Sequence, residues 1–186
     1  GPPVANRQAG DVGVNITKFL GCMACKARHI GLCQPLASKE LGVVANFKIG
    51  DRHLAAGEHL YHEGDVVQEV YNLLDGWVLL YHVLEDGRRQ ILEVLLRGAF
   101  FGVQPDLKAP MSHSAVCATA VDVCVFPKQR LMDLFRDHTE LAIRTVMMCA
   151  RERVAIHDHM TSLGRRTARE RIAHLLVELD HRLQIQ

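Results

Sequence analysis

Three cysteines near the amino end of the chain have the spacing of a metal-binding segment. Cys22, Cys25 and Cys33 form the pattern C-x2-C-x7-C. Two thiols three residues apart can turn toward one metal centre on a short loop, and the third can close the site after a longer loop. Thiolates bind zinc and iron–sulfur clusters. Positive charge between the cysteines favours the thiolate form, and three such residues are present: Lys26, Arg28 and His29.

This pattern leaves zinc and an iron–sulfur cluster both open, and it requires a fourth ligand from elsewhere in the chain. The alternative is three reduced thiols that bind nothing. Three further cysteines are available, namely Cys117, Cys124 and Cys149. No secretory signal opens the chain. Because cytosolic thiols are held reduced, we expect a cytoplasmic protein with a metal site rather than a disulfide framework.

Charge and hydropathy exclude several classes of protein. The chain has 22 Lys and Arg against 21 Asp and Glu, a formal net charge of +1. A chain so close to neutral does not act as a polycation on nucleic acid or on a membrane. No apolar run approaches the roughly 18 residues that a membrane-spanning helix needs. No nucleophile–base pair or phosphate-binding loop is present, so we do not expect an enzyme.

The cysteines must be positioned by a turn-rich middle section and a helical last third. Glycines recur from Gly50 to Gly102, and none occurs between residues 103 and 163. Asp86-Gly87 is a strong hairpin signal. Short apolar stretches between such turns predict the strands of an antiparallel sandwich or barrel. These stretches are residues 70–74, 77–81, 91–95, 115–120 and 121–126.

The last third of the chain predicts three helices. Pro127 can begin a short one, and Thr139 is a candidate N-cap for a long one over about residues 140–163. Thr167 and Glu170 have the spacing of a capping box that opens the last helix. The long helix carries a stripe with alternating steps of four and three, which is the period of a coiled-coil seam. The stripe consists of Ile143, Met147, Ala150, Val154, His157 and Thr161.

We expect this stripe to pair with the same helix of a second subunit. The alternative is that it packs on the barrel of its own chain.

The order and spacing of the middle motifs resemble the sensory β-roll of the CRP/FNR transcription regulators. The first motif reads L-x-x-G-E-x-L-Y-H-E-G-D at 54–65, and others follow at 70–78, 84–91 and 98–102. The resemblance runs from about residue 22 to residue 183. It implies a mainly β protein with added helices. Its antiparallel β-roll would be a jelly roll like a cyclic-nucleotide-binding domain, followed by a long dimerisation helix.

Two branches of that family differ in what they bind. The nucleotide-binding branch has a cassette with a Glu for the ribose and an Arg for the cyclic phosphate. Here the corresponding stretches read F-G-V-Q-P at 101–105 and M-S-H-S-A at 111–115. The Glu is missing, and Ser112-His113 stands where the Arg would be. A phosphate without a charge partner would be poorly stabilised, so we expect no cyclic nucleotide and no nucleotide-binding residues.

The other branch is FNR-like and senses oxygen through a [4Fe-4S] cluster. Its members hold the cluster with an N-terminal cysteine group and one late cysteine of the β-roll. The late cysteine resembles Cys124, which lies just before Pro127. The resemblance therefore implies that Cys22, Cys25, Cys33 and Cys124 are the ligands, with Cys117 as the fallback for the fourth. The cluster would be one that an aerobic preparation can lack. The seven-residue gap before Cys33 resembles a subgroup rather than the best-known members, which leaves the shape of this loop open.

The resulting prediction is the sensory part of an FNR-like regulator. Its cluster would control homodimerisation, and hence DNA binding through a C-terminal domain that this chain does not include. We divide the chain into a flexible start with the remnant of a cleaved tag (1–15), the cysteine segment (16–40), the β-roll (41–138), the dimerisation helix (139–164) and the start of a hinge and DNA-binding domain (165–186), cut before its helix-turn-helix. The alternatives are a zinc-binding, haem-binding or metal-free dimerisation module. Haem would have no use for three clustered thiols.

Overall fold

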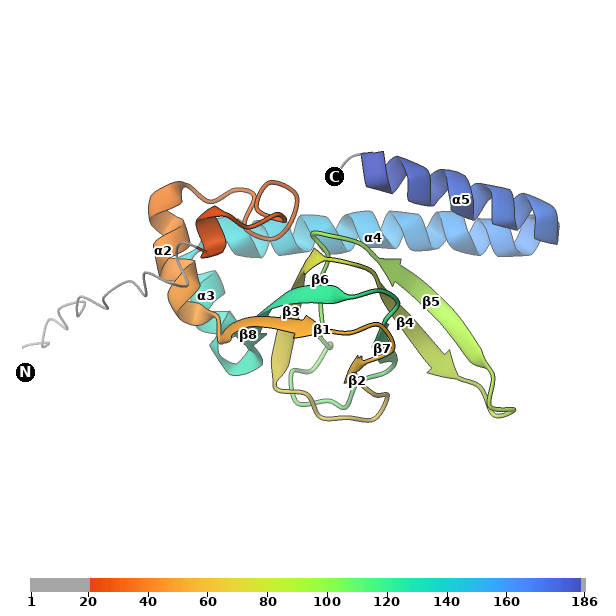
Figure 1. Ribbon diagram of the computed structural model, residues 1–186, viewed down its shortest axis with the longest axis horizontal. Coiled ribbons are helices and arrows are strands. Elements are labelled where there is room, and N and C mark those ends of the chain that lie inside the picture. Colours follow the sequence, from red (N-terminus) through yellow and green to blue (C-terminus); the bar gives the residue numbers. More distant parts are fainter. Residues whose placement is uncertain (1–20, 185–186) are drawn as a thin grey trace, which may run out of the picture.

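The computed structural model describes residues 21–184, apart from the side chains at positions 159, 162, 163 and 165. The segment expected to hold a tag remnant (1–15) therefore lies outside the described residues, as do 16–20 of the cysteine segment. Two four-stranded antiparallel sheets form the β-roll, with the strand orders β1-β8-β3-β6 and β2-β7-β4-β5. Helices cover one end and one side of this roll (Figure 1). The predicted fold class, an antiparallel jelly roll followed by a long helix, is confirmed.

The strands occupy the turn-rich middle section that the glycines indicated. The first sheet contains β1 (Gly50–Leu54), β8 (Val121–Pro127), β3 (Glu69–Asp75) and β6 (Phe100–Phe101). The second contains β2 (His59–Tyr61), β7 (Ser114–Cys117), β4 (Val78–Val83) and β5 (Arg89–Leu95). The predicted hairpin joins β4 to β5, and Gly87 has a φ of 80°, which a residue with a Cβ rarely adopts.

The helices begin with one that the sequence did not indicate, α2 (Ser38–Phe47), which crosses the boundary drawn at residue 41. After β8 come the 3-10 turn η1 (Lys128–Arg130) and α3 (Leu131–Asp137), where Pro127 predicted a short helix. The long helix α4 (Thr139–Arg165) begins at Thr139 itself, one residue earlier than its expected start. With 27 residues it is roughly 40 Å long.

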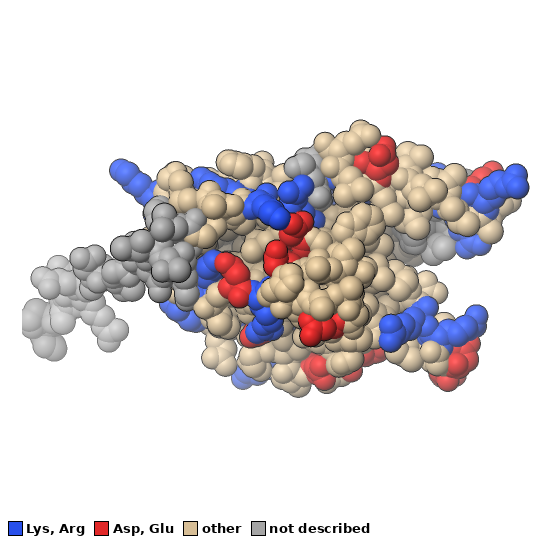
Figure 2. Space-filling view, in the orientation of Figure 1, with Lys and Arg blue, Asp and Glu red and all other residues tan. Residues whose placement is uncertain are grey.

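The last helix, α5 (Ala168–Gln184), turns back along α4 and lies beside it (Figure 1). The predicted capping box opens it. The Thr167 backbone N–H donates to Glu170 Oε2 at 2.8 Å, and the Glu170 N–H donates to Thr167 Oγ1 at 3.4 Å. No helix among the described residues is long and apolar enough to cross a membrane. Basic and acidic side chains are interspersed on the face shown in Figure 2.

Alternation along β8 separates two apolar cores. Successive side chains of a strand point to opposite faces, so Val121, Val123 and Val125 face the interior of the roll, while Cys124 and Phe126 face outward. The outward-facing residues join a second core, which we call the helix-side core. It packs the cysteine segment and three helices against the first sheet. Its members are Leu32, Leu36, Leu41, Val44, Phe47, Val70, Phe100, Cys124, Phe126, Leu131, Leu134 and Leu141.

Candidate metal centre

A series of tight turns folds the cysteine segment onto the first sheet. The Arg28 N–H donates to the Cys25 carbonyl, the Gly31 N–H to the Ala27 carbonyl and the Leu36 N–H to the Cys33 carbonyl, at 2.8–3.1 Å. Two apolar side chains anchor these turns, since Ala27 is 1% exposed and Leu32 is fully buried. Residues 21–23 are helical, which places Cys22 in the last helical turn before Cys25.

Gly31 and Gly98 allow the loop between Cys25 and Cys33 to touch the β5–β6 turn. A Cβ on Gly31 would lie 3.0 Å from Asn72 Oδ1 and 3.3 Å from the Gly98 Cα. A Cβ on Gly98, whose φ is 90°, would lie 3.1 Å from the Ile30 side chain. Larger residues at either position would push the cysteine loop away from the sheet.

Three strands supply the floor of the site. Cys124 of β8 is paired with Asp51 of β1 on one side and with Asn72 of β3 on the other. The three residues form a row across the outer face of the first sheet, directly beneath the cysteine segment. The hydrogen-bond register of the sheet therefore fixes the position of Cys124, which is 7% exposed.

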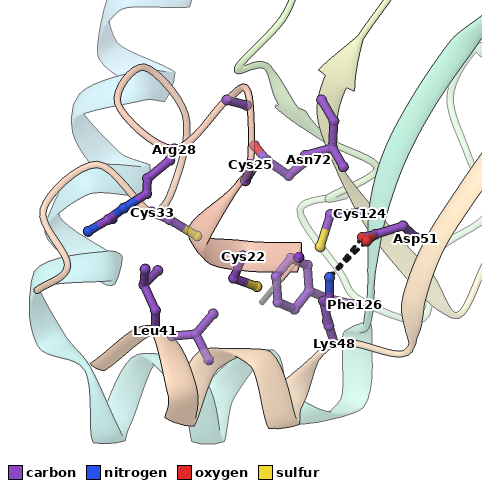
Figure 3. Close-up of a pocket in the computed structure, with 14 residues that line it drawn as sticks. Cys22, Cys25, Arg28, Cys33, Leu41, Lys48, Asp51, Asn72, Cys124 and Phe126 are labelled. Atoms are coloured by element: carbon purple, nitrogen blue, oxygen red, sulfur yellow. Dashed lines mark hydrogen bonds and ion pairs between the residues drawn. The ribbon is translucent and has the colours of Figure 1, made fainter. Parts of the chain in front are cut away.

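The four cysteines predicted as ligands lie around one cavity. In Figure 3 the sulfur atoms of Cys22, Cys33 and Cys124 face the same space, and Cys25 lies beside Asn72. The empty space is about 430 Å³, including its open mouth. The lining residues are Gly21, Cys22, Cys25, Ala27, Arg28, Cys33, Leu41, Val44, Lys48, Asp51, Asn72, Leu74, Cys124 and Phe126.

One buried cation faces these thiols. Lys48 follows α2 and is only 4% exposed, and its Nζ donates to both oxygens of Asp51 at 2.9 and 3.0 Å. Burial by itself lowers the pKa of Lys48, but the nearby Cys124 and Asp51 raise it above its ordinary value. Arg28 contributes a second cation and donates to the Leu36 carbonyl from both Nη atoms at 3.3 Å. These two cations can therefore stabilise the negative charge of thiolates in the cavity.

Burial raises the pKa of three of these thiols and so favours their protonated form. It raises the pKa of Cys33 to about 12, and the neighbouring Cys22 and Cys25 add to the effect. Burial also raises the pKa of Cys124 and of Cys22, while Lys48 opposes the rise at both. A metal that binds here must release these protons, which its own charge makes favourable.

The donor set suits a metal centre bound by thiolates. All six cysteines lie within the described residues and none is in a disulfide. Four thiols from two segments share one cavity with two cations, which matches the all-cysteine ligation of a [4Fe-4S] cluster or of a zinc ion held by four thiolates. By their number, chemistry and shared cavity these residues suit the predicted cluster, and thiolates are zinc ligands as well.

The structure places the remaining two cysteines elsewhere. Cys117 lies on β7, is 1% exposed and belongs to the core inside the β-roll, on the other side of the first sheet from the cavity. Cys149 is exposed on α4. The alternation of β8, which turns Cys124 outward between two inward-facing valines, was the signal that could have singled out Cys124.

One hydrogen bond joins the cysteine loop to the long helix. Arg144 of α4 donates from Nη2 to the Ile30 carbonyl at 2.9 Å. Ile30 lies between the second and third cysteines of the segment. Arg144 is half-buried, and its Nε has no hydrogen-bond partner among the described residues. Neither Arg144 nor Lys48 could be connected with the cysteines from the sequence, because nothing in the spacing of these residues links them.

The six stripe residues of α4 are all exposed. Ile143 and Met147 are each 57% exposed and Val154 is 61% exposed. Ala150, His157 and Thr161 are also exposed. The alternative of a stripe packed on its own barrel is therefore wrong. An apolar row of this length on the outer face of a helix is typical of a protein–protein contact.

Residues of the two stretches that resemble the nucleotide cassette are buried or hydrogen-bonded to neighbouring side chains. Gln104 is 7% exposed. His113 accepts or donates at both ring nitrogens, to Tyr61 Oη at 3.1 Å and to Ser112 Oγ at 3.2 Å. Burial, followed by the charge of His82, lowers the pKa of His113. A neutral imidazole at this position does not replace the charge of an Arg.

Several histidines of the β-roll have side-chain partners of their own. These pairs are His53–Asp122 at 2.7 Å, His59–Tyr81 at 2.9 Å and His82–Glu63 at 3.0 Å. Each of the first two pairs joins neighbouring parts of one sheet and the third joins β4 to the turn after β2, so each of these histidines has a structural partner.

The chain is similar in sequence to one protein family and to several curated regulators. Residues 51–138 match the family model of the cyclic nucleotide-binding domain. The chain is 35% identical over 163 residues to the nitrogen fixation regulation protein FixK of Bradyrhizobium diazoefficiens, covering 87% of this chain and 67% of the relative. It is 30% identical over 161 residues to the transcriptional activator protein FnrL of Cereibacter sphaeroides, covering 87% and 64%.

A solved structure agrees with these relatives. The structure of FixK2 from Bradyrhizobium japonicum superposes with a TM-score of 0.64 at 31% identity, covering 71% of this chain and 66% of that one. The chain spans about two thirds of the length of the curated relatives. The relatives named here are transcription regulators rather than enzymes.

Proposed function

The chain belongs to the CRP/FNR family of transcription regulators and contains the sensory domain of such a regulator, and we propose that this domain senses oxygen through a [4Fe-4S] cluster. Cys22, Cys25, Cys33 and Cys124 would be its ligands. The observation that carries the proposal is that these four thiols share one cavity. When bound, the cluster supplies an oxygen-reactive redox centre whose presence depends on the oxygen level.

Other residues of the cavity would offset the charge of the ligands and exclude water. Lys48 and Arg28 offset the negative charge of four thiolates. Leu41, Val44 and Phe126 line the cavity with apolar surface and limit the access of water. The two cations stabilise the deprotonated ligands, and the apolar lining slows loss of the metal by limiting the access of solvent.

Arg144 connects the site to the proposed dimer contact. The cysteine loop is ordered best when all three of its thiols are held at one centre. Its Ile30 carbonyl is then fixed for Arg144, whose helix carries the exposed stripe on another face. A loop that loses its centre loses this contact and changes how α4 sits on the roll. In the intact protein we expect that change to alter homodimerisation and DNA binding, as a shift between two populations.

Anaerobic reconstitution with iron and sulfide tests the ligand set. We expect close to four irons and four sulfides per chain and visible absorption in the wild type. Cys124→Ala should abolish loading. Cys117→Ala is the matched control, because it removes a similarly buried thiol from the other core, and it should load normally. Normal loading in Cys124→Ala would refute the assignment, and a colourless protein that binds only zinc would instead assign these thiols to a structural site.

Exposure of the loaded protein to air tests the sensing step. We expect iron release together with a change in the fraction of dimer measured by sedimentation velocity. Cluster loss with an unchanged dimer fraction would contradict the proposed coupling, even with the ligand set intact.

A further inference from the structure

A second cluster of possible metal ligands lies away from the cysteines, where three helical segments meet. Glu40 lies in α2, His138 is the C-cap residue of α3, and Glu140 lies in the first turn of α4. One ligand atom from each of the three residues lies within 4.8 Å of the others. Among the described residues, nothing discussed so far accounts for this convergence.

His138 brings a buried imidazole to this cluster. The residue is only 8% exposed. Its Nδ1 lies 3.2 Å from Glu140 Oε1, whereas its Nε2 is buried and has no hydrogen-bond partner among the described residues. Nδ1 is therefore the nitrogen that a cation shared with Glu140 would bind.

Hydrogen bonds to the backbone hold His138 and Glu40 in place. The His138 N–H donates to the Leu134 carbonyl at 2.9 Å, and its carbonyl accepts from the Leu141 N–H at 3.0 Å. Glu40 is oriented by the start of α2, because its Oε2 accepts from the Ala37 N–H at 2.6 Å. That bond leaves Oε1 of Glu40 for a ligand. A bound cation would thus find carboxylates already oriented by surrounding hydrogen bonds.

We propose that Glu40, His138 and Glu140 form a binding site for a divalent cation of the zinc type. One imidazole and two carboxylates are a common zinc donor set, whereas calcium and magnesium prefer oxygen ligands alone. Zinc–ligand bonds of about 2.0–2.2 Å place ligand atoms roughly 3.4 Å apart. Rotation of the two glutamate side chains, both partly exposed, closes the present spread of up to 4.8 Å.

The site would tie the segment that follows the cysteines to the start of the long helix. α2 begins five residues after Cys33, and α4 begins next to His138. A cation between them would pin α2 to the α3–α4 corner, next to the helix-side core. This site is separate from the thiol cavity and does not depend on the proposed function.

The thiols must be removed from the experiment, because they bind zinc themselves. We would replace Cys22, Cys25 and Cys33 together by Ser, which is mild because all three are partly exposed. Zinc binding to this triple variant is measured by equilibrium dialysis with metal analysis. We expect one zinc per chain and a higher melting temperature with zinc present.

Ligand variants in the same background decide the assignment. Glu40→Gln and His138→Gln should each weaken zinc binding by at least about tenfold and reduce the zinc-dependent rise in melting temperature. His157→Gln is the control, because it changes an exposed histidine of α4, and it should bind as the parent does. If His138→Gln does not fold, zinc binding by Glu40→Gln tests the assignment of the ligands. Failure of the triple variant to bind zinc, or equal binding by Glu40→Gln, would overturn the site.

Discussion

Replacing Arg144 by Met tests whether the cysteine loop controls the long helix through one hydrogen bond. Met keeps an apolar stem of similar length and removes every donor. The bond it deletes joins Arg144 Nη2 to the Ile30 carbonyl at 2.9 Å across 114 positions of sequence. Burial, and then the charge of Arg151, lower the pKa of Arg144, but a guanidinium remains charged at neutral pH.

The expected size of the effect depends on two nitrogen atoms of Arg144, the bonded Nη2 and the buried Nε. A hydrogen bond from a charged donor contributes about 1.5–3 kcal/mol. Arg144 also buries an Nε that has no partner among the described residues, and Met removes that cost. We therefore expect the free energy of unfolding of the apo protein to fall by only about 1 kcal/mol. The free energy that couples the cluster to the dimer should fall by most of the energy of this bond. The ratio between the dimer dissociation constants of the cluster-free and loaded forms should therefore change roughly 10- to 100-fold.

Sedimentation equilibrium of loaded and cluster-free protein, under anaerobic conditions, measures this coupling. In the wild type we expect the dimer dissociation constants of the two forms to differ, and in Arg144→Met we expect that ratio to approach one. Arg136→Met is the control, because Arg136 is exposed and its partner among residues 21–184 is Asp133 on its own helix, at 2.9 Å. A ratio in Arg144→Met equal to the wild-type ratio would refute the reasoning and leave Arg144 a purely structural residue.

Three further predictions follow from the described side chains. Val154→Arg should weaken the dimer at least about tenfold, since it places like charges across a seam, while Met132→Arg, at a similarly exposed position on α3, should leave sedimentation unchanged. Burial first, and then Glu93, raise the pKa of Glu152 to about 7 against the opposing charge of Arg182, so the folded state loses stability as pH rises from about 4.5 to 7. With a discount for its partial exposure, Glu152→Gln should raise the unfolding free energy by about 1 kcal/mol at pH 8 and hardly at pH 4, and an equal gain at both pH values in denaturant titrations would contradict this. Cyclic AMP should show no micromolar binding by calorimetry, because His113 occupies the place of the phosphate-binding Arg, and a measured micromolar site would show this interpretation of the pocket to be wrong.

Local signals predicted the elements of this protein well, because they act on the backbone within a few residues. The Asp86-Gly87 turn, the capping box of Thr167 and Glu170 and the unbroken helix after Thr139 all appear as expected. A left-handed glycine or a side chain that caps its own helix needs no distant partner to be effective. The helix α2 was missed because its ten residues include Gly42 and two Val, which are weak helix formers.

The candidate sites depended on packing that no local pattern contains. Spacing predicted a metal segment at Cys22, Cys25 and Cys33 but left the fourth ligand open, and only family resemblance suggested Cys124. The tertiary structure separates Cys124 from Cys117, because the register of β8 between β1 and β3 turns Cys124 outward, while Cys117 on β7 faces the interior of the roll. Arg144 meets Ile30, and Glu40 meets His138, only after the helix-side core has formed. These contacts join residues about a hundred positions apart, and such juxtapositions are set by how the sheets and helices pack rather than by the sequence around either residue.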